Sequence, residues 1–597
     1  MACRRRKAAD ATDERVSMRS VLLSALLASA MTLPVPLAAQ DAKQDITGLW
    51  AAKKRFGPDV RGTLTLVREA SGWRAEIAGR EAAVTRAGDT LRFTLAGELG
   101  GFRGRIEGNR IRGHWIQPRS VTGGMRYATP VVLAAAGPSL WRGEVRPLDE
   151  TFTLYLKIDR EADGRLGVFL RNPDRNIGRN VDLRHIELKD GHVRLLGKPG
   201  GATEEVEIAA GSFDAGNRLL SIAIPGRGNS YDFEPAGALS DFYPRPGLTA
   251  PYAYRAPLPK LDGWPVSTLT AEAIDRAAIE RFVQMLIEQP IDSVHAQDIH
   301  AVLIARHGKL VLEEYLHGID GDALHDTRSA AKSLTSVLVG AAMQQGTRIG
   351  PETPVYATME KTLPADLDPR KRAMTLGDLL GMASGFHCDD RDPKAPGNED
   401  VMQDQEAQPD WYRYALDLPM VAAPGASRVY CSTNPNLAGG VLAKVTGEPL
   451  EQSFDRLIAR PMQFGPYALN LQPTGEPYMG GGAQFRPRDF MKLGQLMLDG
   501  GNWQGKRILS ADWVRRSTAP RGELRGLHYG YLWWGIDLPW QGEKLPAFYA
   551  AGNGGQVVIV VPKLDLVVAI FGGNYGDKVM YVPQEKYTPD HILPAVR

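Results

Sequence analysis

The sequence contains little cysteine, little net charge and few long hydrophobic runs. It has 3 cysteines in 597 residues, and 71 basic side chains against 69 acidic ones leave a formal net charge of +2. Such a balance favours neither nucleic acid nor any strongly charged partner. Beyond the N-terminus no segment stays apolar for the roughly 20 residues that cross a bilayer. With 43% hydrophobic and 23% charged residues, the chain is typical of globular proteins, and its length predicts several domains.

Several catalytic signatures are missing as well. The chain has no Gly-x-Ser-x-Gly elbow, no His-x-x-x-His zinc pair and no P-loop. These absences disfavour an α/β-hydrolase elbow, zinc-dependent hydrolysis and nucleotide chemistry. We therefore expect no cofactor and no bound metal.

The N-terminus has the pattern of a secretion signal. A basic residue precedes the apolar run Val21–Ala28, and small residues follow at Leu37–Ala39 before the chain turns polar. We predict a signal peptide over residues 1–39 and an exported, periplasmic protein, with Met18 as an alternative start. A retained membrane anchor is the other interpretation, and Pro34 and Pro36 argue against it.

Export would leave two cysteines, because Cys3 would be removed with the signal. Cys388 and Cys431 are then an even pair in an oxidising compartment, and we predict a disulfide between them. The alternative is two separate buried thiols. Neither cysteine has the cysteine neighbours of a zinc site.

Residues 45–243 read as strands in a tandem duplication. Gly48-Leu49-Trp50 opens a first repeat, 45–137, and Ser139-Leu140-Trp141 opens a second, 138–243, with hairpins at matching places in each. Two small barrels, or one barrel built from two halves, would satisfy this pattern. The region offers no catalytic group, so we interpret it as a scaffold or a binding module.

A proline-rich linker at 244–266 precedes a predicted α+β domain at 267–597. The linker is followed by a helical pattern and a hairpin, and helices dominate from Ser329 to about Leu498. Strands return near the C-terminus, at Tyr529–Ile536, Gln556–Val561 and Leu566–Phe571. This order predicts an antiparallel sheet, flanked by helices, that joins the two ends of the domain.

Ser329 and Lys332 are the most informative residues of the chain. Three positions apart on a helix, they share one face, so the amine can reach the hydroxyl and activate it. The helix that follows is apolar, and its N-terminus favours a developing negative charge. A capping serine beside a surface lysine is the alternative interpretation. No other serine in the chain has lysine three residues later.

Two further segments carry what such a pair needs. Tyr430, in Tyr430-Cys431-Ser432, becomes a candidate base if it lies beside a protonated lysine. The segment Gly552–Gln556 directly precedes a strand, where a glycine backbone can approach a ligand and donate an N–H to an oxyanion. A core tyrosine and an ordinary glycine turn are the alternatives.

With these elements in order, residues 269–575 resemble the serine hydrolases related to class C β-lactamases, penicillin-binding D,D-peptidases and the esterases of that fold. Ser329-x-x-Lys332 matches the first motif and Tyr430-x-Ser432 the Tyr-x-Asn motif. Asn553-Gly554-Gly555 stands where the family has Lys-Thr-Gly or His-x-Gly. The supporting segments are Met374–Gly385, Gly439–Gly447, Arg486–Phe490 and Tyr529–Trp534.

The resemblance implies acyl transfer through a serine ester. Ser329 would attack a carbonyl, and Lys332, with its pKa lowered by burial and by Tyr430, would take or relay the proton. Tyr430 would protonate the leaving group and later activate water. The N–H groups of Ser329 and Gln556 would form the oxyanion hole, beside Gly555. The residues expected to line the pocket are aromatic: Trp411, Tyr529, Trp533 and Trp534.

Two departures from the family pattern bear on the substrate. Asn553 replaces the lysine or histidine of the third motif, and Ser432 replaces the asparagine of the second. Both favour a small ester or amide over a β-lactam or a peptide. D-amino-acid peptidase and β-lactamase activities remain alternatives, as does a non-catalytic binding protein that keeps the fold.

The loop at 388–400 also resembles one branch of the group, and its place near the tyrosine motif supports the predicted disulfide. The loop and its flanks are rich in possible metal ligands: His387, Asp389, Asp390 and Asp392. A metal site is one interpretation, and solvated loop carboxylates are the one we favour.

Overall fold

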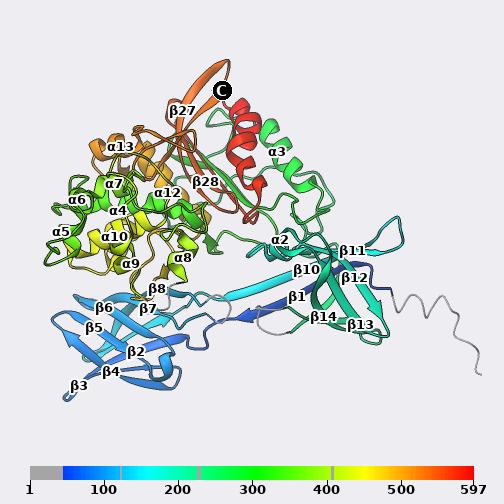
Figure 1. Ribbon diagram of the computed structural model, residues 1–597, viewed down its shortest axis with the longest axis horizontal. Helices are drawn as coiled ribbons and strands as arrows, with labels where there is room; N and C mark the ends of the chain where they lie inside the picture. Colours follow the sequence, from blue (N-terminus) through cyan, green and yellow to red (C-terminus); the bar gives the residue numbers. More distant parts are fainter. Residues whose placement is uncertain (1–44, 121–123, 225–229, 405–408) are drawn as a thin grey trace, which may run out of the picture. The chain divides into compact units, whose positions relative to one another are not determined.

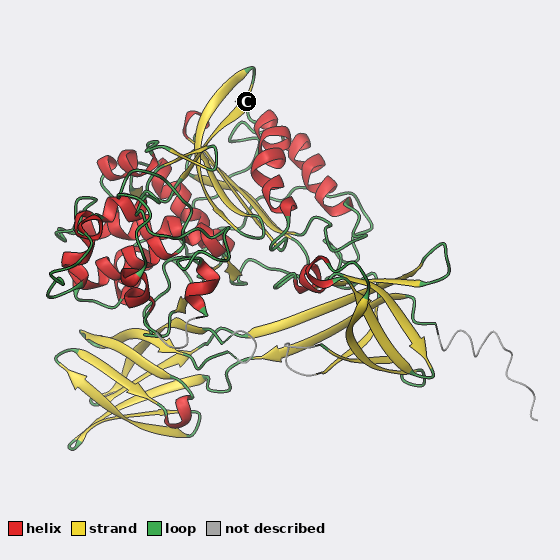
Figure 2. Cartoon of the chain, viewed as in Figure 1, coloured by secondary structure: helices red, strands yellow, loops and turns green. Residues whose placement is uncertain are grey.

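The computed structural model describes residues 45–120, 124–224, 230–404 and 409–597. The predicted signal peptide at 1–39 and the alternative start at Met18 lie outside these residues. Residues 46–597 make up one unit, which contains two β barrels and an α+β domain (Figures 1 and 2). Within the described part of the chain, no helix combines the length and the apolar character that crossing a membrane requires.

Each barrel is a ring of eight antiparallel strands. Barrel 1 comprises β2 Gly62–Glu69, β3 Gly72–Ile77, β4 Arg80–Ala87, β5 Thr90–Thr94, β6 Gly101–Glu107, β7 Arg110–Ile116, β8 Arg126–Gly137 and β9 Leu140–Val145. Barrel 2 comprises β1 Gly48–Phe56, β10 Glu150–Arg160, β11 Leu166–Arg171, β12 Leu183–Lys189, β13 His192–Gly197, β14 Val206–Asp214, β15 Leu219–Ala223 and β16 Ser230–Ala236. The short helix α2, Ile177–Val181, connects β11 to β12.

The two barrels exchange their opening strands. β1, at the start of the first repeat, pairs along its length with β10 and also with β16, both in barrel 2. β9, at the start of the second repeat, pairs with β2 and β8 and closes barrel 1. Trp50 is accordingly buried against Phe213 in barrel 2, and Trp141 packs on Trp73 in barrel 1. Neither sequence repeat, 45–137 or 138–243, is therefore a barrel by itself.

The α+β domain has an eight-stranded antiparallel sheet in the order β18-β17-β29-β28-β27-β26-β25-β24. Its strands are β17 Ile299–Arg306, β18 Lys309–Tyr315, β24 Glu523–Leu524, β25 Leu527–Tyr529, β26 Trp534–Trp540, β27 Glu543–Gly552, β28 Gln556–Val561 and β29 Leu566–Gly572. β17 pairs with β29, which confirms the predicted sheet that joins both ends of the domain. The single strand predicted at Tyr529–Ile536 is instead divided between β25 and β26, and β27 was not predicted.

Helices cover both faces of this sheet (Figures 1 and 2). They are α3 Arg276–Glu288, α4 Lys332–Gln344, α5 Val355–Met359, α6 Pro369–Ala373, α7 Leu376–Leu380, α8 Glu399–Gln403, α9 Trp411–Asp417, α10 Thr433–Thr446, α11 Leu450–Phe454, α12 Pro487–Leu498 and α13 Ala511–Thr518. Alternate residues of β17 face opposite sides. Leu303 packs in the core with α4, α10 and α12, whereas Ile304 packs with α3 and the C-terminal helical segment Pro583–Ile592.

Barrel 1 is joined to the α+β domain by a strand pairing. β20, Tyr467–Leu471, pairs with β8 and carries the barrel sheet on to the short strands β21, Gln484–Phe485, and β19, His325–Asp326. A guanidinium N–H of Arg103 in β6 also donates to Glu451 Oε2 over 2.8 Å. Burial raises the pKa of the Glu451 carboxyl to about 7, against the opposing effect of Arg103. The sheet of barrel 1 thus continues to β19, the short strand that precedes Ser329 in the chain.

Candidate active site

Ser329 and Lys332 meet at the start of α4. A single 3₁₀ turn, Arg328–Ala331, leads directly into the helix. Lys332 Nζ donates to Ser329 Oγ over 2.8 Å and to the carbonyl of Gly480 over 2.6 Å. The lysine is 2% exposed, because the whole first part of α4 lies in the core. Its amine is therefore held at the serine hydroxyl, as the spacing predicts.

The charge state of Lys332 differs from the expectation. Burial opposes the positive charge, but the Tyr430 hydroxyl and the carboxylates of Glu399 and Asp390 outweigh it, so the pKa of Lys332 is raised. The predicted lowering is wrong, because the sequence does not show that two carboxylates lie near the amine. Lys332 is consequently protonated in the resting site.

The Tyr430 ring lies close to the amine of Lys332. Its ring centre is 5.0 Å from Lys332 Nζ, and it stacks on Trp534 at 5.7 Å. Tyr529 packs edge-on against Trp534 at 4.7 Å. Of the other aromatic residues expected at the pocket, Trp533 contacts Phe548 and Trp411 contacts Tyr478. Trp534 is thus the aromatic residue of the predicted set that directly contacts Tyr430.

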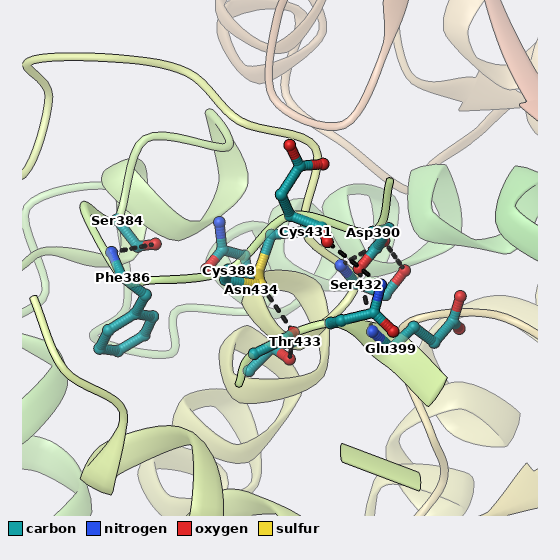
Figure 3. Close-up of a disulfide and its surroundings, with 12 residues drawn as sticks. Ser384, Phe386, Cys388, Asp390, Glu399, Cys431, Ser432, Thr433 and Asn434 are labelled. Carbon is teal, nitrogen blue, oxygen red and sulfur yellow. Dashed lines mark hydrogen bonds between the residues drawn. A yellow bond between two sulfur atoms is a disulfide. The ribbon is translucent and has the colours of Figure 1, made fainter. Parts of the chain in front are cut away.

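A disulfide and a carboxylate fix the segment that carries Tyr430 (Figure 3). Cys388 and Cys431 are bridged, with 5.6 Å between their Cα atoms, which confirms the predicted disulfide. Asp390 Oδ2 accepts hydrogen bonds from the Ser432 amide at 2.9 Å and the Ser432 hydroxyl at 2.6 Å. The Asp390 amide donates to the Tyr430 carbonyl at 3.0 Å. The tyrosine segment is therefore held on both sides of Cys431.

Asp390 and Glu399 are site residues that the sequence reasoning missed. Asp390, expected to be a solvated carboxylate, also accepts from the Glu399 amide, and Glu399 accepts from the Tyr478 hydroxyl. Burial, and then the charge of Glu399, raise the pKa of Asp390 to about 6, with Lys332 and Ser432 opposing. Among the described residues no three His, Cys, Asp or Glu side chains are grouped as a metal site requires. The signal in the sequence was the place of Asp390, two residues after Cys388.

The glycine-rich segment approaches Ser329 at a different residue from the one expected. A Cβ on Gly552, the last residue of β27, would lie 2.4 Å from Thr327 O, 2.9 Å from Ala330 N and 3.1 Å from Ser329 N. Only glycine can therefore occupy this position without moving the backbone of the Ser329 turn. Gly552 lies three positions before Gly555, the glycine that the family resemblance places in the third motif.

The remaining residues of this segment serve to hold it. The Asn553 side chain accepts from the Gly576 amide at 2.6 Å. Gln556, at the start of β28, is fully buried, and its side-chain amide donates to Gly572 O at 2.7 Å and to Asn553 O at 3.2 Å. The structure therefore brings the backbone of Gly552 to Ser329, and Asn553 follows directly, whereas the Gln556 side chain is bonded to β29.

The disulfide gives a first prediction. Replacing Cys388 and Cys431 together by serine frees a loop closed over a sequence separation of 43 residues, so we expect a loss of up to about 4 kcal/mol in the free energy of unfolding. Urea denaturation measures it. Reductant should reproduce this loss in the wild type and change nothing further in the double variant; equal urea midpoints for the two proteins would contradict the expectation.

Asp390 gives a second prediction, on pH dependence. Its folded pKa of about 6 lies above the ordinary value of 3.8 for an aspartate, so between these pH values the folded state binds the extra proton. Its contribution to stability therefore grows as the pH falls through 6. We expect the free energy of unfolding of the wild type, minus that of Asp390→Asn, to rise by about 2 to 3 kcal/mol at most between pH 7 and pH 4.

Urea unfolding at a series of pH values measures this difference. Asp392→Asn, at an exposed position of the same loop, is the matched control. A difference between the wild type and Asp390→Asn that stays constant from pH 7 to pH 4 would show that Asp390 is not buried against Glu399 in solution.

Comparison with known proteins places this domain. Residues 292–574 match the family model described as beta-lactamase. With the antiparallel sheet, its flanking helices and the Ser-x-x-Lys turn in place, this part of the chain belongs to the beta-lactamase family, whose fold it shares with transpeptidases.

Individual relatives are more distant. The chain is 26% identical over 229 residues to the 6-aminohexanoate-dimer hydrolase of Paenarthrobacter ureafaciens. The match covers 37% of this chain and 57% of that protein, so it spans little more than half of the relative's length.

Similar solved structures include two proteins with low sequence identity to this chain. One is a D-stereospecific amidohydrolase from a Streptomyces species, with a TM-score of 0.39 and 17% identity over 52% of this chain and 98% of that one. The other is a penicillin-binding protein homologue from Caulobacter crescentus, with a TM-score of 0.39 and 14% identity over 50% of this chain and 91% of that one.

Proposed function

We propose that this protein is a serine hydrolase that cleaves a small ester or amide through a covalent acyl-enzyme. The observation that carries the proposal is the 2.8 Å hydrogen bond from Lys332 Nζ to Ser329 Oγ, in a buried site that Tyr430 completes. The name of the relative from Paenarthrobacter, a hydrolase of an amide dimer, supports a small amide as one substrate class.

Ser329 Oγ attacks the substrate carbonyl and forms the acyl ester. Because Lys332 is protonated at rest, it acts as a relay between Ser329 and Tyr430. As Tyr430 gives its phenol proton to the leaving oxygen or nitrogen, Lys332 replaces that proton and takes the proton of Ser329, so both side chains end in their starting states. In the second half, water attacks the ester carbonyl, and its proton returns through Tyr430 and Lys332 to Ser329.

The negative charge on the carbonyl oxygen requires donors on the side away from Lys332. The Ser329 amide stands at the N-terminal end of α4, where the helix dipole favours an anion. We assign the second donor to the Asn553 amide, since it follows Gly552, whose backbone lies against that of Ser329. This assignment differs from the predicted backbone N–H of Gln556, a residue that begins the next strand, β28, where it pairs with Gly552.

The residue types near Ser329 favour esters and small amides. If Gly552 is the motif glycine, Ala550 takes the place of the lysine or histidine of the third motif, so the family's cation is missing in this alignment too. The hydroxyl of Ser432 is directed to Asp390, so it is not free to orient a peptide amide. Both features support the preference inferred from the sequence.

A substrate panel tests the proposal. It comprises p-nitrophenyl esters, D-amino-acid amides and a chromogenic cephalosporin, each assayed with the wild type and with Ser329→Ala. Turnover of an ester or amide that is lost in the variant supports the assignment. Turnover of the cephalosporin alone would favour a β-lactamase. Equal rates in both proteins, or none in either, would overturn the hydrolase proposal and favour a binding protein that keeps the fold.

We also propose that the mature protein is exported to the periplasm. The predicted signal at 1–39 supports this, and so does the Cys388–Cys431 bridge, which needs an oxidising compartment to persist. N-terminal sequencing of the protein recovered from a periplasmic fraction tests the cleavage site. An uncleaved N-terminus on protein found with the membranes would favour a retained anchor.

A further inference from the structure

Arg525 lies over the ring of Tyr430. It occupies a two-residue turn between β24 and β25, since Leu524 pairs with Leu527 across it. Arg525 and Gly526 both have positive φ values, 56° and 77°, as in the tight turns that connect twisted strands. The turn places the guanidinium carbon 4.3 Å from the centre of the Tyr430 ring. Arg525 thus reaches Tyr430 from an element that carries none of the family motifs.

Within the described residues, this guanidinium has no carboxylate partner. Over the ranges that the structure describes, neither Arg525 nor the nearby Arg391 has a carboxylate oxygen within 4 Å. The positive charge of Arg391 disfavours that of Arg525, so two like charges lie near each other. Such an arrangement is unfavourable by itself and becomes favourable when an anion binds between or against the two side chains.

The nearby acidic groups have other partners. Asp390 accepts from the amide and hydroxyl of Ser432 and from the Glu399 amide, and Glu399 accepts from Tyr478. Lys332, the other cation near Tyr430, is committed to Ser329 and Gly480 inside the core. Among the described residues, Arg525 is therefore a cation over the Tyr430 ring that is not committed to a carboxylate or to the Ser329 turn.

The end of β27, which approaches the Ser329 turn, carries no cation. β27 runs to the Ser329 turn through Tyr549, Ala550, Ala551 and Gly552, which contribute no positive charge. An anionic group near the scissile bond would thus find a partner in the β24–β25 turn and none in residues 549–552 of β27. A guanidinium also offers paired N–H donors that fit the two oxygens of a carboxylate.

We propose that Arg525, with Arg391 beside it, binds a carboxylate of the substrate, so that this protein prefers acidic esters or amides to neutral ones. The inference rests on the proposed hydrolase function and adds the class of substrate to it. The carboxylate would belong to the acyl or leaving group that passes over Tyr430.

A pair of substrates that differ only in charge tests the proposal. They are the mono-p-nitrophenyl ester of glutaric acid and its methyl ester, which masks the carboxylate. We expect Arg525→Ala to lower kcat/KM for the acid at least about 10-fold more than for the methyl ester, mainly through KM. Arg525→Lys should restore part of the difference, and added salt should reduce the wild-type preference.

Arg521→Ala is the matched control. Arg521 lies 3.8 Å over the ring of Tyr531, so this variant also removes an arginine from a tyrosine ring close to the same hairpin, but not from Tyr430. It should leave the ratio of the two rates unchanged. Equal losses on both substrates in Arg525→Ala would show that Arg525 only orients Tyr430 and would overturn the proposal.

Fluorophosphonate labelling of Ser329 separates this inference from the function on which it rests. A wild-type protein that labels but hydrolyses the acid no faster than the methyl ester overturns the carboxylate site and leaves the hydrolase standing. A wild-type protein that neither labels nor hydrolyses either ester overturns both.

Discussion

Replacing Ser329 by alanine should abolish covalent labelling by a fluorophosphonate and lower kcat/KM for the best ester by about 10³-fold or more. The variant removes the oxygen that Lys332 holds at 2.8 Å, and no other hydroxyl can take its place as the nucleophile in the proposed reaction. Intact-mass measurement detects the adduct. Lys332→Ala should also lose the label, because the hydroxyl then has no relay for its proton.

Ser333→Ala is the control for this experiment. Ser333 is the next serine on α4, but its hydroxyl donates to the Leu532 carbonyl and lies away from Lys332. It should label as the wild type does. An adduct that persists in Ser329→Ala, or that is equally lost in Ser333→Ala, would mean that the reagent reports another nucleophile or a general loss of folding.

Adding a single methyl group at Gly552 should lower kcat/KM almost as much as replacing Ser329 does. In Gly552→Ala the added Cβ would overlap Thr327 O and press on the amides of Ala330 and Ser329, which are backbone atoms and cannot move away as a side chain would. The strand end must then withdraw, and the Asn553 amide with it. We expect kcat/KM to fall by about 100-fold or more, as when an oxyanion donor is lost.

Gly237→Ala provides the comparison, since an added Cβ there meets no atom within 4 Å. It should match the wild type in rate and stability. The rate of fluorophosphonate labelling in Gly552→Ala distinguishes displaced donors from a blocked nucleophile. Wild-type turnover in this variant would show that β27 does not lie against the Ser329 turn in solution.

The parts of the site that depend on short-range spacing could be predicted from sequence. Ser329 and Lys332 are three residues apart, and helical geometry alone brings them together. The Cys388–Cys431 bridge followed from a count of cysteines. The sheet followed from strands at both ends of the domain, because only an antiparallel arrangement joins them without long crossings.

The missed features depend on contacts between distant segments. The pKa of Lys332 takes its direction from Tyr430, Glu399 and Asp390, which are 98, 67 and 58 positions further along the chain, and the sequence does not show that they meet at the amine. The choice between Gly552 and Gly555 depends on how far β27 extends, and that strand was not predicted. Propensity and motif spacing carry no information on such distances.

The exchange of strands between the barrels could not be predicted from the sequence, for a related reason. β1 and β9 both carry a Leu-Trp pair at their start, Leu49-Trp50 and Leu140-Trp141, and this pair does not distinguish one ring from the other. Pattern alone cannot decide which pairing is adopted, because it records which face of a strand is buried and not the identity of its neighbour.

That exchange makes the duplicated region indivisible. β1 is made first but pairs with β10 and β16, which begin at Glu150 and Ser230, so the ring that contains it closes only after every strand of the other ring has been synthesised. A cut between residues 137 and 138 would leave two fragments, each missing its own closing strand and carrying the other's. The pair must be expressed, truncated or transplanted as one piece, and a fragment that begins after β1 would expose two unpaired edges in the barrel farther along the chain.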